Sequence, residues 1–262
     1  MMTPGIVSVT FRNLDIFEII ALAAENGLKA VETGGDVHLL PGDAEKAAKI
    51  REAAEKAGVK PLSYGSYYRC LGNEEEEKTL IATAKALGAG NIRVWAGDAG
   101  SVDQFGYAKP LGDASQAVYR GRVVETARRL CDSAAVEGMT VSFEWHMGTL
   151  TDTCASAVSV AEDIGRPNLR LYWQPNQFRD FETNLSELKT ALPYVSTVHV
   201  FSWKGRDMFP LADQTKEWKA YIGVLAADGR DHDLLMEFVP HGEKDELVRD
   251  AAVLNGWIRE LA

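Results

Sequence analysis

The sequence predicts a closed (β/α)8 barrel that occupies residues 1–262 as one domain. Eight short apolar segments, rich in β-branched residues, alternate with eight helical segments, and no unit is left over. The apolar runs show little polar alternation, as expected of parallel strands that are buried on both faces. The length of 262 residues also agrees with the roughly 250 residues typical of this barrel.

The first four units follow one pattern, in which an apolar run precedes a helix that ends near a glycine. Residues 6–11 form the first predicted strand, and residues 14–26 carry apolar side chains at helical spacing. The next strand and helix pairs are 30–32 with 43–57, 61–68 with 74–87, and 91–97 with 115–137. Gly58 and Gly88 directly follow two of these helices, where a left-handed residue commonly ends an α-helix. A glycine-rich insertion, 98–113, separates the fourth strand from its helix.

The last four units continue this order. Their strands are 140–146, 169–174, 196–202 and 234–239, and their helices are 152–164, a short one before Pro193, one ending near Gly229, and 245–261. A second insertion, 203–213, follows strand seven. Because both insertions leave the carboxyl ends of strands, they are predicted to cover the mouth of the barrel and exclude water. The alternative is an open doubly wound sheet, but no Gly-x-Gly-x-x-Gly follows the first strand.

Composition restricts the classes of function. The formal net charge of −10 argues against a nucleic-acid partner, which needs a basic surface. The three cysteines are widely spaced, which favours reduced thiols and a cytoplasmic location. No apolar run approaches membrane length, and the first residues do not resemble a signal peptide. The expected partner is therefore a small molecule, and self-association stays open.

Polar side chains gather at the predicted carboxyl ends of the strands, where barrels of this class carry their active sites. On strand five, Glu144 and His146 are two residues apart and therefore share one face of an otherwise apolar strand. A buried carboxylate without a partner is costly, so a cation or a substrate is expected beside it. Gln174, His199 and Glu237 take corresponding positions on strands six to eight. Such oxygen and nitrogen donors suit Mn²⁺, Mg²⁺, Co²⁺ or Zn²⁺.

This order of polar residues on strands five to eight resembles the xylose-isomerase-like superfamily. That group includes sugar isomerases, ketose 3-epimerases, inosose dehydratases and the endonuclease IV type of DNA-repair enzyme. The motifs that carry the resemblance are Phe143-Glu144-Trp145-His146, Tyr172-Trp173-Gln174-Pro175-Asn176, Val198-His199-Val200 and Met236-Glu237-Phe238. The resemblance implies that Glu144 and Glu237 are metal-bound carboxylates that also act as the acid/base pair. It implies His199 and Gln174 as further ligands. Gln174 replaces the aspartate usual in the family, so weaker metal binding is implied.

A site of this kind suits the removal of a proton beside a carbonyl group. A divalent cation between the carbonyl and hydroxyl oxygens stabilises the enediolate, and a carboxylate on each side of its plane can take and return a proton. The predicted function is therefore a metal-dependent sugar isomerase or epimerase acting on a ketose or related polyol. Alternatives are a keto-polyol dehydratase, which shares the first step, and a non-catalytic sugar-binding barrel. A DNA-repair nuclease is disfavoured, since it needs more metal-ligating histidines and a basic face.

Further side chains at the same rim are predicted to contact the substrate. Aromatic rings there suit the apolar faces of a sugar, although a place in the core is the alternative for each. His146 is expected to bind a substrate hydroxyl rather than the metal. For Glu32, pairing with Arg93 is weighted equally with substrate binding. No glycine-rich phosphate cradle is evident, which favours an unphosphorylated sugar. The predicted contacts are Glu32, His38, Tyr64, Trp95, His146, Trp173, Asn176, Trp203 and Arg206.

Overall fold

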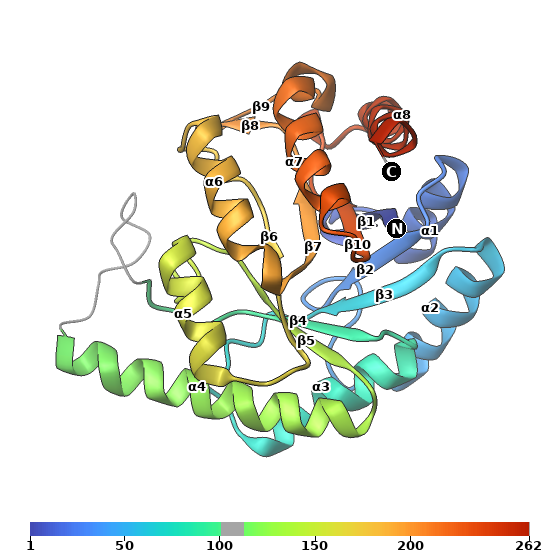
Figure 1. Ribbon diagram of the computed structural model, residues 1–262. Coiled ribbons are helices and arrows are strands. Elements are labelled where there is room, and N and C mark those ends of the chain that lie inside the picture. The colour runs from blue at the N-terminus through green and yellow to red at the C-terminus, as the bar shows by residue number, and fades with distance from the viewer. Residues whose placement is uncertain (101–112, 262) are drawn as a thin grey trace.

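The computed structural model describes residues 1–100 and 113–261. Within these residues eight parallel strands close into a barrel, with the neighbour order β1, β10, β7, β6, β5, β4, β3, β2. The helices form a layer outside the strands (Figure 1). The predicted (β/α)8 class is therefore confirmed. No helix in the described part of the chain is long and apolar enough to cross a membrane.

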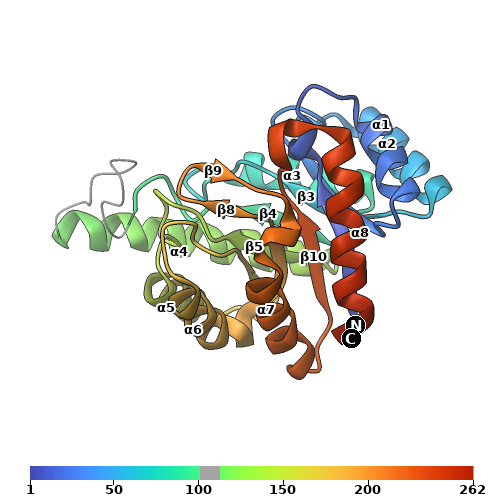
Figure 2. The ribbon, with the colours of Figure 1, turned by 90° about the horizontal axis from the view of Figure 1, so that it is seen from above.

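The elements follow the chain in strict alternation. The barrel strands are β1 (Met2–Val7), β2 (Ala30–Gly34), β3 (Lys60–Gly65), β4 (Asn91–Val94), β5 (Thr140–Glu144), β6 (Leu169–Trp173), β7 (Val195–Val200) and β10 (His232–Met236). The helices are α1 (Ile16–Glu25), α2 (Ala44–Ala57), α3 (Glu74–Leu87), α4 (Asp113–Val136), α5 (Cys154–Ile164), α6 (Phe181–Ala191), α7 (Thr215–Ala227) and α8 (Lys244–Leu261). The last turn of α8 lies beside the start of β1 in both views (Figures 1 and 2).

Local signals set the ends of these helices. Asn73 caps α3 through a capping box, in which its side chain accepts from the backbone N–H of Glu76 and the Glu76 carboxylate accepts from the Asn73 N–H. Asp43 caps α2 through a hydrogen bond in which its side chain accepts from the backbone N–H of Lys46. Gly58 and Gly88 end α2 and α3 with left-handed φ values of 67° and 75°, which glycine adopts without strain.

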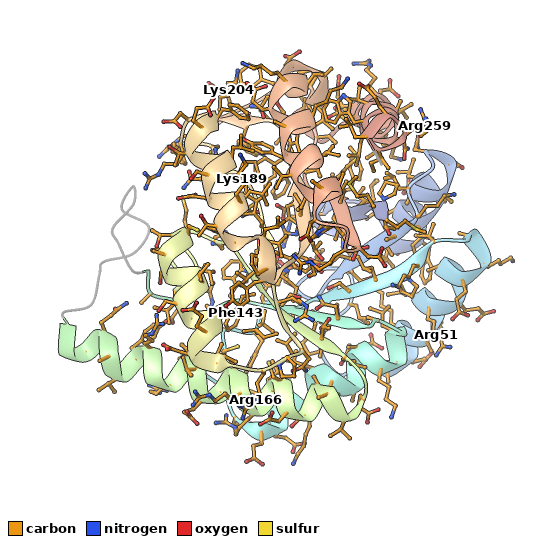
Figure 3. The ribbon with its side chains drawn as sticks, in the orientation of Figure 1. Arg51, Phe143, Arg166, Lys189, Lys204 and Arg259 are labelled. Carbon is orange, nitrogen blue, oxygen red and sulfur yellow. The ribbon has the colours of Figure 1, made fainter. Side chains whose placement is uncertain are left out.

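Side chains alternate between the barrel interior and the layer under the helices. On β5, Phe143 packs into the apolar layer, whereas Ser142 and Glu144 point inward to polar partners from β4. Figure 3 shows Phe143 within the fold and charged side chains such as Arg51 and Arg259 at its periphery. The interior thus carries the polar groups, and the main hydrophobic core lies between strands and helices.

Asn91 is the centre of a polar network in the barrel interior. Its amide nitrogen donates to Ser63 Oγ at 2.9 Å and to the Tyr172 hydroxyl at 3.0 Å. Its amide oxygen accepts from Ser142 Oγ at 2.7 Å and from Thr140 Oγ1 at 2.8 Å. A fully paired network of this kind makes a rigid interior, on which the inward-pointing side chains at the ends of the strands are held in place.

Strand one differs from its prediction. It spans Met2–Val7 rather than 6–11, and residues Ser8–Phe11 form a 3-10 helix. The sequence does not predict a strand at residues 2–5, because Pro4 and Gly5 are both unfavourable inside strands. Gly5 is required by close packing, since a Cβ there would lie 2.6 Å from the carbonyl oxygen of Ala30 on β2.

The second insertion contains a short antiparallel hairpin, β8 (Trp203–Lys204) with β9 (Asp207–Met208), which the sequence did not indicate. After the hairpin, the backbone N–H of Leu211 donates to the buried carboxylate of Asp250 on α8 at 2.9 Å. Most of the first insertion, residues 101–112, lies outside the described residues, so its predicted role as a lid stays a prediction.

Candidate active site

A cavity of about 520 Å³ opens at the carboxyl ends of the barrel strands. It is lined by side chains from most of the loops that follow these strands, including many predicted as site residues. The predicted residues that line it are Trp95, Glu144, His146, Gln174, Asn176, Trp203 and Glu237. Phe201, Met208 and Phe238 add apolar surface to the same walls.

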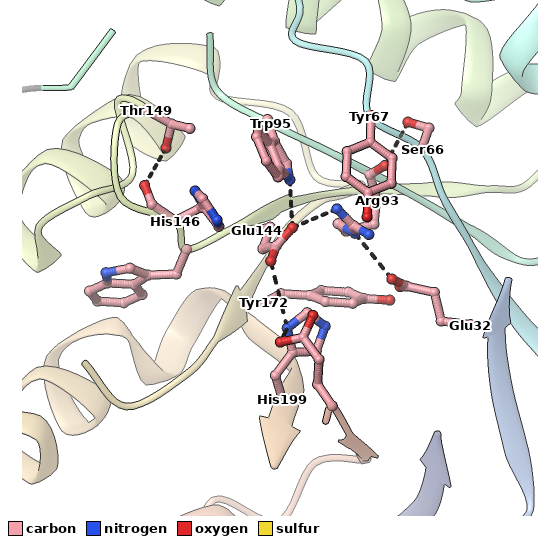
Figure 4. A network of polar contacts seen from close by, with 12 residues as sticks. Glu32, Ser66, Tyr67, Arg93, Trp95, Glu144, His146, Thr149, Tyr172 and His199 are labelled. Atoms are coloured by element: carbon pink, nitrogen blue, oxygen red, sulfur yellow. Dashed lines mark hydrogen bonds and ion pairs between the residues drawn. The ribbon is translucent and has the colours of Figure 1, made fainter. Parts of the chain in front are cut away.

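Glu144, His199 and Glu237 form a buried cluster in the depth of this cavity. One ligand atom from each residue lies within 4.8 Å of the others. Nδ1 of His199 is 3.2 Å from Oε2 of Glu237 and 3.8 Å from Oε1 of Glu144. Figure 4 shows the imidazole facing the Glu144 carboxylate across the end of the barrel. The structure thus brings together three residues that are up to 93 positions apart, from Glu144 to Glu237, in the sequence.

Gln174 completes this cluster. Its amide nitrogen donates to the backbone oxygen of Trp145 at 2.7 Å, which fixes the orientation of the amide because a carbonyl oxygen only accepts. Oε1 therefore faces inward, 2.9 Å from Nδ1 of His199. Three oxygens approach this one nitrogen, which carries at most one proton. A cation among these four donor atoms would satisfy all of them, so the donor set fits a divalent metal ion.

The pKa values of His199 and Glu144 are both shifted in the direction that favours the charged form of each side chain. Burial by itself would lower the pKa of His199, but the carboxylates of Glu237 and Glu144 raise it to about 9. Burial would raise the pKa of Glu144, but Arg93 and the imidazoles of His146 and His199 lower it to about 2. At neutral pH a proton on His199 supplies the positive charge that the carboxylates attract, and a bound metal ion would compete with that proton.

Arg93 is a fully buried arginine that joins two carboxylates inside the barrel. Its Nη1 donates to Oε2 of Glu144 at 2.5 Å, and its Nε donates to Oε1 of Glu32 at 3.1 Å (Figure 4). The pKa of Arg93 is raised, because these carboxylates outweigh burial, so the guanidinium stays charged. The strand register shifts between Val31 and Glu32, and irregularities of this kind change the direction of a side chain. Glu32 therefore takes the alternative left open by the sequence, the pairing with Arg93.

Trp95 and His146 form one wall of the cavity. Their rings stack with centroids 4.3 Å apart and an interplanar angle of 18°. The Trp95 indole N–H donates to Oε2 of Glu144 at 2.5 Å. Nδ1 of His146 lies 2.6 Å from the backbone oxygen of Met147 and must donate to it. In the neutral ring Nε2 is then an acceptor, as a contact with a substrate hydroxyl requires.

Phe238, directly after Glu237, adopts a left-handed backbone conformation with φ of 65°. Its N–H donates to the Thr10 hydroxyl at 3.0 Å, which holds the turn in place. The ring packs edge-on against Trp203, with centroids 6.2 Å apart, and lines the cavity. Left-handed conformations are unfavourable for residues with a Cβ and concentrate at functional sites.

Besides Glu32, four residues predicted as substrate contacts lie away from the cavity. His38 is buried, where Nδ1 accepts from the Ser8 hydroxyl at 2.8 Å and Nε2 donates to the backbone oxygen of Leu14 at 3.2 Å. Arg206 is exposed on the hairpin turn. Tyr64 and Trp173 lie in the hydrophobic core between the strands and the helices. Side chains alternate along a strand, and the residue next to each of them points into the barrel, so these two point outward. These positions do not support a substrate role for any of the four.

The sequence pointed less clearly to other residues of the site. From the sequence, pairing with Arg93 is one of two equally weighted alternatives for Glu32. Arg93 is not predicted as a donor to Glu144, and Phe238 is named only inside a motif. A signal for Arg93 existed, since one arginine between Ile92 and Val94 in an apolar strand needs a buried counter-charge.

Comparisons with known proteins agree with this architecture. The family model described as "Xylose isomerase-like TIM barrel" matches residues 20–261. A 3-dehydroshikimate dehydratase from Bacillus anthracis is 24% identical over 177 residues, which cover 64% of this chain and 59% of that relative. The match thus spans less than two thirds of the relative's length.

Two solved structures show the same fold. The crystal structure of a probable 3-DHS dehydratase from Bacillus anthracis superposes with a TM-score of 0.76 at 20% identity, covering 97% of this chain and 99% of that one. The structure of an L-ribulose 3-epimerase has a TM-score of 0.74 at 14% identity, covering 100% of this chain and 96% of that one. At these identities the likeness concerns the fold.

Proposed function

Since the chain belongs to the xylose isomerase-like TIM barrel family, we propose that it is a divalent-metal-dependent enzyme that removes the proton beside the carbonyl of a small keto-polyol. The observation that carries this proposal is the convergence of Gln174, Glu144 and Glu237 oxygens on one nitrogen of His199. Such a cluster has little structural use at the end of apolar strands, where buried carboxylates need positive charge.

Glu144, Gln174, His199 and Glu237 would hold the metal ion. A cation bound there supplies positive charge beside the carbonyl oxygen and so makes the neighbouring C–H group more acidic. Glu144 and Glu237 come from different strands, and Glu237 reaches the cavity beside the apolar rings. A carboxylate in such a position can take a proton from carbon and return it.

The rest of the cavity fits a polyol. The rings of Trp203 and Phe238 offer apolar surface to the C–H faces of the substrate, and Trp95, whose ring stacks on His146, lines the same space. Nε2 of His146 can accept a hydrogen bond from a substrate hydroxyl, since Nδ1 is occupied by the backbone. The amide of Asn176 lines the same space and adds polar groups. Together these groups would orient a hydroxylated ring or short chain with its carbonyl toward the carboxylates.

The enolised substrate has two outcomes. In a dehydration, a hydroxyl on the next carbon leaves; in an isomerisation or epimerisation, the proton returns to carbon. We place dehydration first, because the sequence and the structure comparisons both include a 3-dehydroshikimate dehydratase. Sugar isomerisation or epimerisation is the second candidate, supported by the likeness to L-ribulose 3-epimerase.

The test is a screen of ketoses, keto-inositols and cyclic keto-acids with Mn²⁺ in D₂O, followed by NMR. The expected result is metal-dependent exchange of the hydrogen beside the carbonyl with at least one compound, together with an unsaturated product if dehydration follows. Glu237→Gln should lower the exchange rate about 100-fold or more, and chelation of the metal should abolish exchange. Binding of a sugar without proton exchange, both with Mn²⁺ and after chelation, would instead identify a non-catalytic sugar-binding barrel.

A further inference from the structure

We propose that Arg93 and Trp95 give the two glutamates different roles: they hold Oε2 of Glu144, so Glu144 is a one-oxygen metal ligand and Glu237 alone carries the proton. This inference rests on the proposed function and refines it. It replaces the expectation of an equivalent acid/base pair with a site that has a single base.

The first step is the occupancy of Glu144. Both Nη1 of Arg93 and Nε1 of Trp95 donate to Oε2 of Glu144, each at 2.5 Å. A carboxylate oxygen has two lone pairs, so these two donors use both positions on Oε2. Only Oε1 remains, and it faces Nδ1 of His199, where the metal ligands converge. Once a cation is bound to Oε1, Glu144 keeps a single free lone pair, on the oxygen that already holds the cation, and none on Oε2.

The second step is that Arg93 cannot turn away from Glu144. Its side chain is fully buried, and Glu32 holds the other side of the guanidinium at 3.1 Å. Gly65 closes the space around this pair, because a Cβ there would lie 2.6 Å from Oε1 of Glu32 and 3.0 Å from Nη2 of Arg93. Leaving a buried carboxylate unpaired is costly, so the guanidinium stays between Glu32 and Glu144.

The third step is the contrast with Glu237. In residues 1–100 and 113–261, no arginine, lysine or tryptophan donates a hydrogen bond to its carboxylate; its ion-pair partner is His199, at 3.2 Å. The side chain of Glu237 is 10% exposed and that of Glu144 is 5% exposed, and both line the cavity. Glu237 can therefore reach a substrate carbon with an oxygen that no fixed donor holds.

A single base restricts the reaction. Epimerisation at one carbon requires removal of a proton from one face and delivery to the other, which needs two groups. Dehydration needs only one. Glu237 takes the proton beside the carbonyl, and the C–H electron pair forms the enolate. That pair then forms the new C=C bond as the C–O bond to the next hydroxyl breaks, and the departing hydroxide takes the proton from Glu237 and leaves as water.

The first experiment compares Glu144→Gln with Glu237→Gln at saturating Mn²⁺, following deuterium exchange with a substrate found in the screen. Glu237→Gln should lower the exchange rate about 100-fold or more, the range of a lost general base. Glu144→Gln should lower the exchange rate less, by about tenfold, since it loses a metal ligand and not the base. An equal loss in both variants, or formation of an epimer by the parent enzyme, would overturn the proposal.

The second experiment needs no substrate. The double variant Glu32→Gln with Arg93→Met removes the buried pair at constant net charge, and calorimetry measures Mn²⁺ binding to the substrate-free protein. Because Glu144 no longer shares its charge with a guanidinium, Mn²⁺ should bind about tenfold tighter or more. Trp95→Phe, which removes a donor without leaving a charge unpaired, should change Mn²⁺ affinity in the same direction by less. Unchanged or weaker binding in both would contradict the role given to Arg93 and Trp95.

These two experiments separate the inference from the proposed function. If the parent enzyme exchanges no proton with any compound of the screen, the proposed function fails, and the Mn²⁺ measurements still decide the role of Arg93. If exchange occurs but depends equally on both glutamates, the proposed function stands and the single-base inference falls. Circular dichroism spectra of each variant establish that the fold is retained.

Discussion

Replacing the amide of Gln174 by a carboxylate of the same length tests how the site holds its cation. In Gln174→Glu a carboxylate oxygen would replace the amide oxygen that lies 2.9 Å from Nδ1 of His199, and would bring one negative charge to the ligand set. A unit charge about 4 Å from another contributes about 4 kcal/mol at an effective dielectric of about 20. Divalent metal binding should therefore become tighter.

Part of this gain is offset in the metal-free protein. The pKa of His199 is already raised to about 9 by its carboxylate neighbours, and a further carboxylate would raise it more. A metal ion must displace that proton, which costs about 1.4 kcal/mol for each unit by which the pKa lies above the pH. The net gain expected at pH 8 is about 1–3 kcal/mol, or roughly 5- to 150-fold in affinity.

Calorimetric titration with Mn²⁺ measures this change. Gln177→Glu is the matched control, because Gln177 lines the same cavity and its new charge would lie outside the cluster around His199. Thermal unfolding should show a separate cost of about 1–3 kcal/mol in Gln174→Glu, since the hydrogen bond to the backbone oxygen of Trp145 is lost. Metal affinity no higher in Gln174→Glu than in Gln177→Glu would refute the assignment of Gln174 as a ligand.

Three further predictions concern positions around the site. His38→Ala should lower the free energy of unfolding by about 1–3 kcal/mol, because it leaves two buried hydrogen-bonding partners unpaired, while the Michaelis constant stays unchanged; a raised Michaelis constant at full stability would restore a substrate role. Burial raises the pKa of Asp250 to about 6, so its stabilising contribution is complete below about pH 4 and is lost as the pH rises through 6. Asp250→Asn keeps the acceptor for the Leu211 N–H, and denaturant titrations should show its stability relative to the parent rising by about 1–2 kcal/mol from pH 4 to pH 7; a pH-independent difference would contradict this. Gly65→Ala should lower the unfolding temperature and impair proton exchange, because its Cβ would lie 2.6 Å from Oε1 of Glu32, whereas Gly90→Ala, with open space around the added methyl, should affect neither.

The sequence predicts the barrel and three residues whose donor atoms the structure brings together, Glu144, His199 and Glu237. The helix-ending glycines and the alternation of apolar and helical segments identify the units without any tertiary information. Glu144, His199 and Glu237 stand out for a different reason, since charged or titratable groups inside apolar strands need a shared partner. Both kinds of signal are local in the chain, and closure of the barrel then brings the strand ends together.

The direction of individual side chains was harder to predict. Parallel strands are apolar on both faces, so a run such as 169–173 does not reveal which residues point inward. Trp173 was assigned to the cavity, but its neighbour Tyr172 holds the inward position. Asn91 and Arg93 are the polar residues of β4 and are two positions apart. This alternation indicates that both side chains point to the barrel interior, and so could have predicted the place of Arg93.

The backbone conformation at Phe238 has a consequence for how this barrel would respond to selection for stability alone. Glycine adopts a φ of 65° freely, whereas phenylalanine there is strained by about 1–3 kcal/mol. A more stable protein is therefore within reach of a single substitution, which would also remove an aromatic ring from the cavity wall and loosen the chain directly after Glu237. Screens for thermostability that do not also select for activity should find glycine at position 238. Those variants should unfold at a higher temperature and bind their ligand more weakly.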